Sequence, residues 1–192
     1  ATNTQRAVIS KDGSKFISLN GGGINIWSEA EGRILYSQLD PEQYIRDADF
    51  SPLGNKAVTL SADSMISVLD LTSGGLIYRV PSHSESVSSA FFSPDEKLFA
   101  SVEGSRALVR DAVTGVFINQ LEPGPDSVKL EEIFFSHDGK KIAATGGNFI
   151  KIWEVPSGKI VRQIRGTTGK FNKVVFNPSG DEILINEGWD SK

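Results

Sequence analysis

The two histidines are the first side chains to consider for catalysis or metal binding. His83 and His137 lie 54 residues apart, and the 192-residue chain contains no cysteine. Neither histidine has a second histidine at a His-x-x-x-His spacing or a cysteine partner, so the sequence lacks the ligand spacing of a zinc site. We expect His83 to be structural, bonded to nearby backbone, and His137 to lie solvated in a hairpin turn. We therefore predict that neither histidine is catalytic or binds a metal ion, and we expect no cofactor.

A pair of carboxylates is the second candidate. Asp47 and Asp49 are two residues apart, so in a strand they share one face. Such a pair could bind a cation, although further oxygen ligands are missing from the neighbouring sequence. Asp49 also occupies a position that is normally small and apolar, for which the sequence gives no reason.

Two glycine clusters could suggest phosphate binding. Gly21–Gly23 and Gly146–Gly147 lack the Gly-Lys-Ser/Thr ending of a phosphate loop, and neither opens a helix. We predict tight turns between strands at both places. No serine lies in a Gly-x-Ser-x-Gly nucleophile elbow.

The sequence repeats with a period of about 40 residues, and this repeat must position the side chains described above. One apolar position, followed by Ser or Asn and a turn, recurs at intervals of 41, 42, 43 and 41 residues: Ile9, Phe50, Phe92, Phe135 and Phe176. A second position recurs at 42, 41 and 43 residues, at Trp27, Leu69, Arg110 and Trp153. Each of these is followed five residues later by a glycine, at Gly32, Gly74, Gly115 and Gly158. Two registers with one period indicate a stacked or radial repeat architecture.

One repeat can be divided into four short strands. In the segment 47–80, the stretches 48–51, 56–61, 65–71 and 76–80 are predicted strands, with apolar and polar residues alternating over 56–61 and 65–71 and turn residues between the strands. No stretch shows a sustained helical period. A four-stranded antiparallel unit of this length predicts an all-β fold, a β-propeller built from four-stranded antiparallel blades. We place one propeller array over 1–192, with blades at 1–39, 40–80, 81–121 and 122–164 and a partial fifth at 165–192.

The motif residues resemble those of WD40 repeats. The family's apolar-Ser-Pro-Asp-Gly turn has counterparts in Phe92–Glu96 and Phe135–Gly139, and its Ile-x-Ile-Trp-Asp strand ending resembles Ile150–Gly158. The Gly-His pair that precedes a blade resembles Ser82-His83. The resemblance covers essentially the whole chain and implies a rigid scaffold without chemistry of its own.

The family's hydrogen-bonded set of Asp, His, Ser/Thr and Trp is incomplete in every repeat. Its candidate structural residues are Thr59, Asp63, His83, Ser101, Trp27, Trp153 and Asp190. Arg110, at a Trp position, is expected to form a local ion pair with Asp111 or a hydrogen-bonded substitute. Apolar burial must then be the main stabiliser, through Phe50, Val58, Ile66, Val68, Phe92, Leu98, Leu108, Phe135, Ile142, Ile152 and Phe176. These departures leave NHL-like and TolB-like propeller repeats open as alternatives.

The fifth repeat has two of its four strands. We expect the array to be completed by the rest of a larger propeller, of which this chain would be a fragment, or by another chain, because an unpaired sheet edge promotes aggregation.

Composition narrows the classes of partner. The net charge of −4 is spread without long blocks, which argues against nucleic acid or an anionic membrane as partner. The absence of cysteine favours a compartment without disulfides, and we expect a cytoplasmic protein.

The resulting hypothesis is a protein-interaction platform that binds a protein or peptide. Propellers usually bind on the face that carries the loops preceding each blade and the turns between second and third strands. We predict partner-binding side chains there: Tyr44, Arg46, Glu85, Lys129, Lys170, Phe171 and Trp189. Two alternatives remain, the propeller part of a larger hydrolase or oxidoreductase and the sensor domain of a bacterial signalling ATPase.

Overall fold

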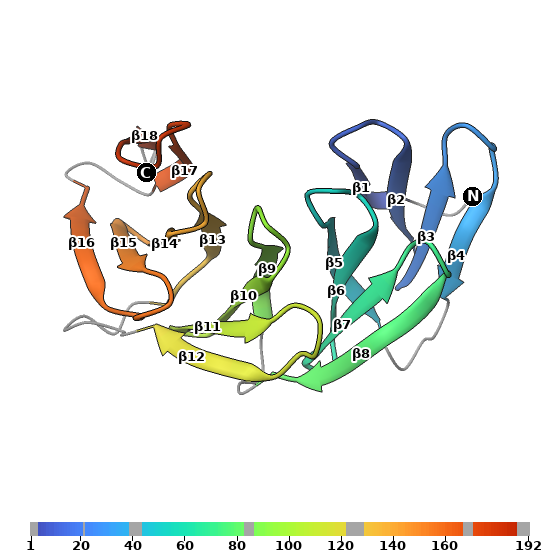
Figure 1. Cartoon of the computed structure of the whole chain (residues 1–192), viewed down its shortest axis with the longest axis horizontal. Helices are drawn as coiled ribbons and strands as arrows, with labels where there is room; N and C mark the ends of the chain where they lie inside the picture. Colours follow the sequence, from blue (N-terminus) through green and yellow to red (C-terminus); the bar gives the residue numbers. More distant parts are fainter. Residues whose placement is uncertain are drawn as a thin grey trace, which may run out of the picture. The chain divides into compact units, whose positions relative to one another are not determined.

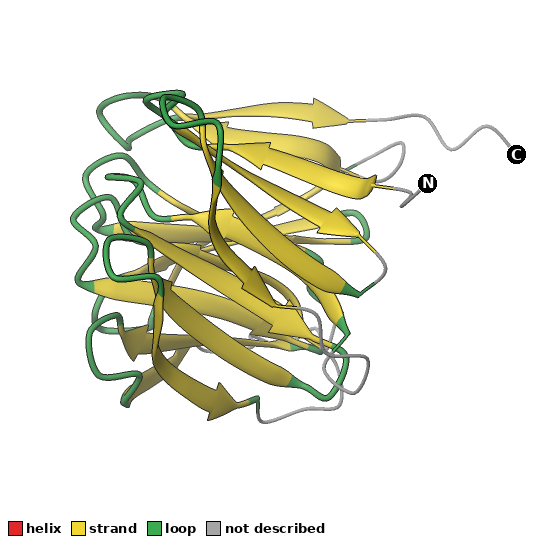
Figure 2. Cartoon of the chain, turned by 90° about the vertical axis from the view of Figure 1, so that its right-hand side faces the viewer, coloured by secondary structure: helices red, strands yellow, loops and turns green. Residues whose placement is uncertain are grey.

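The computed structural model describes residues 4–20, 22–38, 44–82, 87–121, 129–166 and 171–187. Every regular element in these ranges is a β-strand (Figures 1 and 2). Four sheets have four antiparallel strands each, in the chain order of a meander, and a fifth sheet has two. The predicted all-β fold of four-stranded antiparallel blades is confirmed. None of the described segments forms a helix that could span a bilayer.

The strands follow one another without crossover connections. The first sheet contains β1 (Thr4–Ile9), β2 (Lys15–Asn20), β3 (Gly23–Ser28) and β4 (Ile34–Gln38). The second contains β5 (Ile45–Phe50), β6 (Lys56–Ser61), β7 (Met65–Asp70) and β8 (Gly75–Pro81). The third contains β9 (Val87–Phe92), β10 (Leu98–Glu103), β11 (Arg106–Asp111) and β12 (Phe117–Leu121). The fourth contains β13 (Glu132–Phe135), β14 (Lys141–Gly146), β15 (Phe149–Glu154) and β16 (Ile160–Arg165), and the fifth contains β17 (Phe171–Phe176) and β18 (Ile183–Glu187).

The first hairpin of each sheet is closed by the recurring Ser or Asn. In three hairpins the serine hydroxyl donates to a carboxylate two residues later, each at 2.7 Å: Ser10 to Asp12, Ser93 to Asp95 and Ser136 to Asp138. The serine oxygen also accepts the amide of the residue that begins the second strand, as in Lys141 N to Ser136 Oγ at 2.9 Å. The third residue after the recurring Ser or Asn has a positive φ in all five hairpins. This residue is glycine in four hairpins, and in the third hairpin it is Glu96, with a φ of 55°. The repeat is therefore held locally by turn chemistry as well as by apolar burial.

The second recurring position marks an irregularity in every complete sheet. The register between third and fourth strands shifts immediately before Trp27, Leu69, Arg110 and Trp153. The glycine five residues later takes a positive φ each time, between 59° and 73°. Both sequence registers thus correspond to fixed backbone features, a bulge and a left-handed turn.

The chain divides into two compact units. The first comprises residues 1–86 with 113–115, and the second comprises residues 87–112 with 116–192. Within the first unit, one apolar cluster joins the first two sheets through buried residues that include Ile17, Ile26, Ala48 and Leu69. Within the second unit, one cluster includes Val109, Ile133 and Trp153, and another joins the fourth and fifth sheets around Ile150, Phe171 and Val174.

The predicted core is largely confirmed. Eight of its eleven members are at most 9% exposed: Phe50, Val58, Ile66, Val68, Phe92, Leu108, Ile142 and Ile152. Leu98, Phe135 and Phe176 are partly buried and pack against the same clusters.

Candidate protein-interaction surface

Three sheets begin with the same backbone contact. The amide of a residue at or just before the first strand donates to the glycine carbonyl of the turn between the second and third strands of the preceding sheet. The pairs are Ile45 to Gly22 at 2.8 Å, Leu130 to Gly104 at 3.0 Å and Phe171 to Gly147 at 3.3 Å. The three donor residues are buried, at 5%, 3% and 6% exposure. Each contact therefore fixes the segment leading into a sheet, and the residues beside the donor are held at the surface.

The residues that flank these donors include three of the predicted partner-binding side chains, which we call the lead-in residues: Tyr44, Arg46 and Lys129. In the first unit, Tyr44 is half-buried and Arg46 is exposed. The Arg46 guanidinium donates to the carbonyl of Ser61 at 3.3 Å. In the second unit, Lys129 is exposed beside the buried Leu130.

Tyr44 makes contacts through both its backbone and its ring. Its carbonyl accepts the amide of Ala62 at 2.8 Å, and its ring covers the turn at Gly22. A β-carbon added to Gly22 would lie 2.5 Å from Tyr44 Cδ2, and Gly22 has a φ of 85°. Glycine at this turn thus permits the ring to approach. The predicted tight turns are confirmed at Gly22 and Gly147.

Phe171 requires a correction. The sequence placed it among exposed anchors, but its side chain is 6% exposed and belongs to the cluster that joins the fourth and fifth sheets. The reason is its position, because Phe171 is the equivalent of Ile45 and Leu130 and donates the same backbone contact. Glu85, Lys170 and Trp189, together with the predicted structural residues His83 and Asp190, lie outside the described residues.

The predicted structural residues have separate roles in their sheets. Trp27 donates its indole N–H to Ser18 Oγ at 3.0 Å, and Trp153 is fully buried. Thr59 is also buried. Asp63 accepts the Met65 amide at 3.3 Å and also binds the Ser61 hydroxyl and the Arg79 guanidinium. Although partial desolvation opposes the effect, these interactions lower the pKa of Asp63.

Sequence reasoning singled out Arg110 in the third sheet but missed its ionic partner. Arg110 occupies a tryptophan position and lies 2.9 Å from Glu103 and 2.8 Å from Ser101 Oγ, which in turn donates to Glu103 at 2.8 Å. The predicted hydrogen-bonded substitute is therefore present, and the ion-pair partner is Glu103 on the neighbouring strand. The available signal was an acidic residue two positions after Ser101 in an otherwise apolar strand.

The carboxylates of Asp47 and Asp49 have an arginine as neighbour. Arg6 forms an ion pair with Asp47, and the Phe50 amide donates to Asp49 at 2.8 Å. Burial raises the pKa of both carboxyls, against the opposing charge of Arg6. Within the described ranges, no three His, Cys, Asp or Glu side chains gather in a way that could hold a metal ion. The positively charged group beside this pair of carboxylates is the Arg6 guanidinium.

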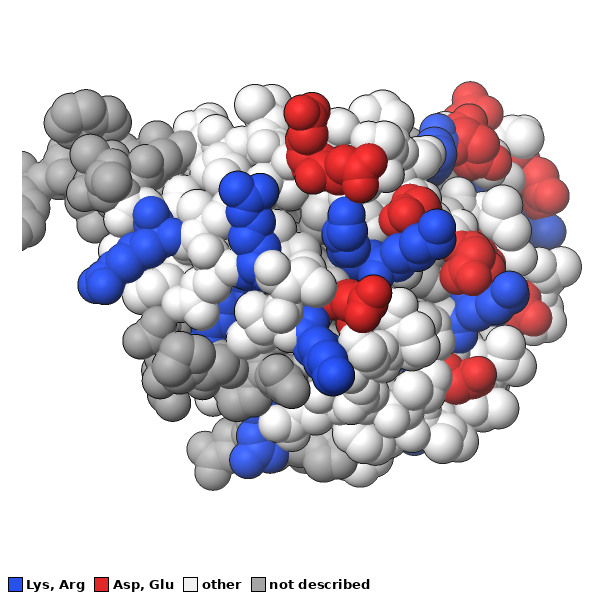
Figure 3. Space-filling view, turned by 60° about the vertical axis from the view of Figure 1, so that its left-hand side comes forward, with Lys and Arg blue, Asp and Glu red and all other residues white. Residues whose placement is uncertain are grey.

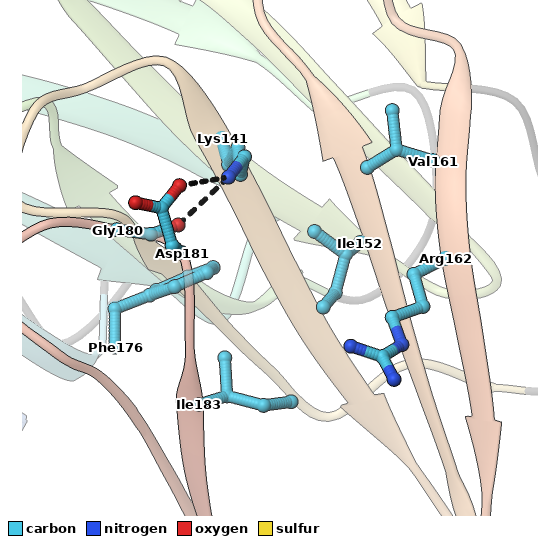
Figure 4. Close-up of a pocket in the computed structure, with 8 residues that line it drawn as sticks. All are labelled: Lys141, Ile152, Val161, Arg162, Phe176, Gly180, Asp181 and Ile183. Carbon is cyan, nitrogen blue, oxygen red and sulfur yellow. Dashed lines mark hydrogen bonds and ion pairs between the residues drawn. The ribbon is translucent and has the colours of Figure 1, made fainter.

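A groove lies between the fourth and fifth sheets of the second unit. A hollow of about 230 Å³ is lined from β14–β16 by Lys141, Ile152, Val161 and Arg162, and from the fifth sheet by Phe176, Gly180, Asp181 and Ile183 (Figure 4). A second hollow shares Arg162, Asp181 and Ile183 and continues past Ile164 and Ile185. Lys141 Nζ closes one end by donating to Gly180 O at 2.9 Å and Asp181 Oδ1 at 3.3 Å.

The space-filling view of Figure 3 shows basic and acidic side chains close together over its right half, whereas the charged groups in its left part are basic.

Comparison with known proteins agrees with this repeat geometry. The family described as WD domain, G-beta repeat, matches residues 74–107, from the turn after β7 to the beginning of β11. An uncharacterized WD repeat-containing protein of Synechocystis is 26% identical over 138 residues, which are 71% of this chain and 39% of that protein.

Two further relatives come from eukaryotes. The human WD repeat and SOCS box-containing protein 1 is 36% identical over 92 residues, covering 47% of this chain and 22% of that protein. A transcriptional corepressor of Arabidopsis thaliana, LEUNIG_HOMOLOG, is 24% identical over 200 aligned residues, covering 82% of this chain and 25% of that protein. The chain therefore spans about two fifths or less of the length of these relatives.

Proposed function

Since the chain is a WD40-repeat protein, we propose that it is a non-catalytic scaffold that binds a protein or peptide partner through its lead-in residues. Tyr44 and Arg46 form the main contact in the first unit, and Lys129 is its counterpart in the second. The names of two relatives, a SOCS box-containing protein and a transcriptional corepressor, support a role in partner binding.

The observation that carries the proposal is the fixed backbone beneath Tyr44 and Arg46. Between them, the buried Ile45 donates to Gly22, while the Tyr44 carbonyl accepts from Ala62. Aromatic and arginine side chains are the commonest energetic anchors of protein interfaces. Holding them on an ordered backbone lowers the entropy that binding would otherwise cost.

Substitution of Arg46 tests the proposal. A partner is captured on the immobilised protein, identified by mass spectrometry, purified and titrated against Arg46→Glu. We expect its affinity to fall at least about tenfold, as for loss of a well-placed interface arginine. Leu53→Glu is the matched control, because Leu53 is 72% exposed at the hairpin turn on the opposite end of β5.

Thermal unfolding must be unchanged in both variants. If Arg46→Glu bound the partner with unaltered affinity, or if both variants lost affinity equally, the lead-in residues would not belong to the binding surface.

A further inference from the structure

The outer edge of the fourth sheet is positively charged at both ends. Among the described strands, β16 pairs only with β15, just as the fourth strand of every complete sheet pairs only with the third (Figure 1). Lys159 lies immediately before β16 and Arg165 ends it, and both side chains are exposed. Residues 155–166 contain three cations and no Asp or Glu. This edge therefore combines positive charge with the unpaired backbone donors and acceptors of an outer strand.

The charge of Lys159 is not balanced as it is in the first sheet. Arg33 and Lys159 each lie six residues after a recurring tryptophan, and each comes just before a fourth strand. Arg33 forms an ion pair with Glu31, whereas Ser157 stands at the place of Glu31 in the fourth sheet. The Ser157 hydroxyl donates to Glu154 Oε2 at 3.0 Å. No ion pair joins Lys159 to an acid in the part of the chain that the structure describes.

Arg165 is positioned by an aromatic ring rather than by an acid. Its guanidinium lies over the Phe149 ring, 5.1 Å from the centroid. The cation of β8, Arg79, is instead paired with Asp63 in the turn between β6 and β7. Within the described ranges, Arg165 has no such acidic partner. A guanidinium has only donors, so its strongest complement is a carboxylate.

A second copy of this chain does not supply the complement at its own outer edges. The outer strands of the four complete sheets, β4, β8, β12 and β16, contain no Asp or Glu. Pairing of two β16 strands would bring their arginines together, which like-charge repulsion opposes. Nucleic acid offers negative charge but no peptide donors and acceptors at strand spacing. An acidic peptide in extended conformation offers both.

From this charge complementarity we infer that the outer edge of β16 binds an extended acidic segment of a separate protein as an additional strand. Carboxylates of the segment face Lys159 and Arg165, which are six residues apart, so the carboxylates are separated by about 20 Å. Arg162 lies between the two cations but lines the hollow toward the fifth sheet, and its charge is not needed. This surface differs from the lead-in residues, and the inference does not depend on them.

A short acidic peptide is the probe. The sequence Glu-Val-Thr-Val-Thr-Val-Glu consists of strand-forming residues between two carboxylates that are six residues apart. Its fluorescein-labelled form is titrated with the 192-residue protein and followed by fluorescence anisotropy. We expect saturable binding, at least about tenfold tighter than that of a control peptide in which glutamine replaces both glutamates. The difference should disappear in about 1 M salt, which screens the charges.

Backbone pairing is tested by chemistry that leaves the side chains unchanged. N-methylation of alternate amides removes the donors along one edge of the peptide, and methylation of the remaining amides is the control. One of the two peptides should bind at least about tenfold more weakly than the other. Equal binding of both would exclude strand addition.

Charge-reversal variants locate the site. Lys159→Glu and Arg165→Glu should each weaken binding of the acidic peptide about tenfold. Lys140→Glu is the matched control, because Lys140 lies in the first hairpin of the same sheet with its side chain 79% exposed. The double variant, Lys159→Glu with Arg165→Glu, should in turn bind a peptide with lysine at both ends more tightly than the parent does. Circular dichroism checks that all the variants fold.

Three outcomes would overturn the inference. These are the absence of saturable peptide binding, losses in Lys140→Glu equal to those in Arg165→Glu, and binding of an oligothymidylate as tight as that of the acidic peptide. The last would make the edge a general site for polyanions. Arg46→Glu should bind the peptide normally, so failure of this site and failure of the lead-in residues are distinguishable.

Discussion

Arg110 and Glu103 form an ion pair 2.9 Å apart across β11 and β10, with side chains only 2% and 0% exposed. Ser101 bridges the pair, accepting from Arg110 and donating to Glu103 at 2.8 Å each. Arg110 also lies over the Phe99 ring, 5.8 Å from its centroid. A charged group thus fills a position that tryptophan takes in the first and fourth sheets.

Removing one member of this pair should be costly. Glu103→Gln leaves a buried guanidinium without its counter-charge and should lower the free energy of unfolding by about 3 kcal/mol or more. Urea denaturation measures the change. Lys97→Ala is the control, because Lys97 and Asp95 form an exposed pair at 3.7 Å, for which a loss within about 0.5 kcal/mol is expected. Equal stability of Glu103→Gln and the parent would show that the pair is dispensable.

Two glycines with left-handed backbones should differ in their tolerance of alanine. Gly13 has a φ of 74°, and a β-carbon added there would meet no heavy atom within 4 Å beyond its two chain neighbours, so Gly13→Ala should cost about 1–2 kcal/mol through backbone strain alone. Gly22→Ala adds a clash with the Tyr44 ring and should cost more. Chemical denaturation of both variants provides the comparison. Equal costs would mean that the ring moves aside freely.

Asp49 should destabilise the fold at neutral pH. Burial is the main cause of its raised pKa, so the folded state binds this proton more tightly than the unfolded state. The penalty is complete above the folded pKa, declines as pH falls through that value and disappears below the ordinary pKa of 3.8. Asp49→Asn should therefore be more stable than the parent at pH 7, and the difference should vanish near pH 3. Thermal melts across this range test it, and a variant less stable at pH 7 would contradict it.

Asp12 should have the opposite pH dependence. Hydrogen bonds from Ser10 and Ser14 lower its pKa to about 2. The carboxylate therefore stabilises the folded state above its ordinary pKa of 3.8, and this contribution is lost as pH falls through about 2. Asp12→Asn should lower the melting temperature at pH 7 but not near pH 2. A constant difference across the range would assign the effect to hydrogen-bond geometry rather than to charge.

The sequence predicted the strands and turns because both depend on short-range chemistry. Alternation over 56–61 matches β6 as observed, and the turn residues around Ser136 fix a hairpin within six residues. The two repeat registers likewise correspond to backbone conformations that each sheet forms on its own.

The sequence pattern could not predict how deeply equivalent positions of the repeat are buried. Phe50 and Ile9 hold the same place in the repeat, yet Phe50 is 9% exposed in the cluster between two sheets and Ile9 is 70% exposed. Phe171 was similarly assigned to the surface, although its backbone contact with Gly147 places it in the core. Exposure depends on the neighbouring sheet, which the repeat pattern does not contain.

By itself, the sequence determined the repeat, its strands and its hairpin chemistry, since these arise within about 40 contiguous residues. The ion-pair partners and the grooves could be identified only from the tertiary structure. Asp47 pairs with Arg6 from the preceding sheet, and Val161 and Ile183 line one hollow from two different sheets. Such pairs depend on cross-strand register and sheet packing, which bring together side chains that no local spacing connects.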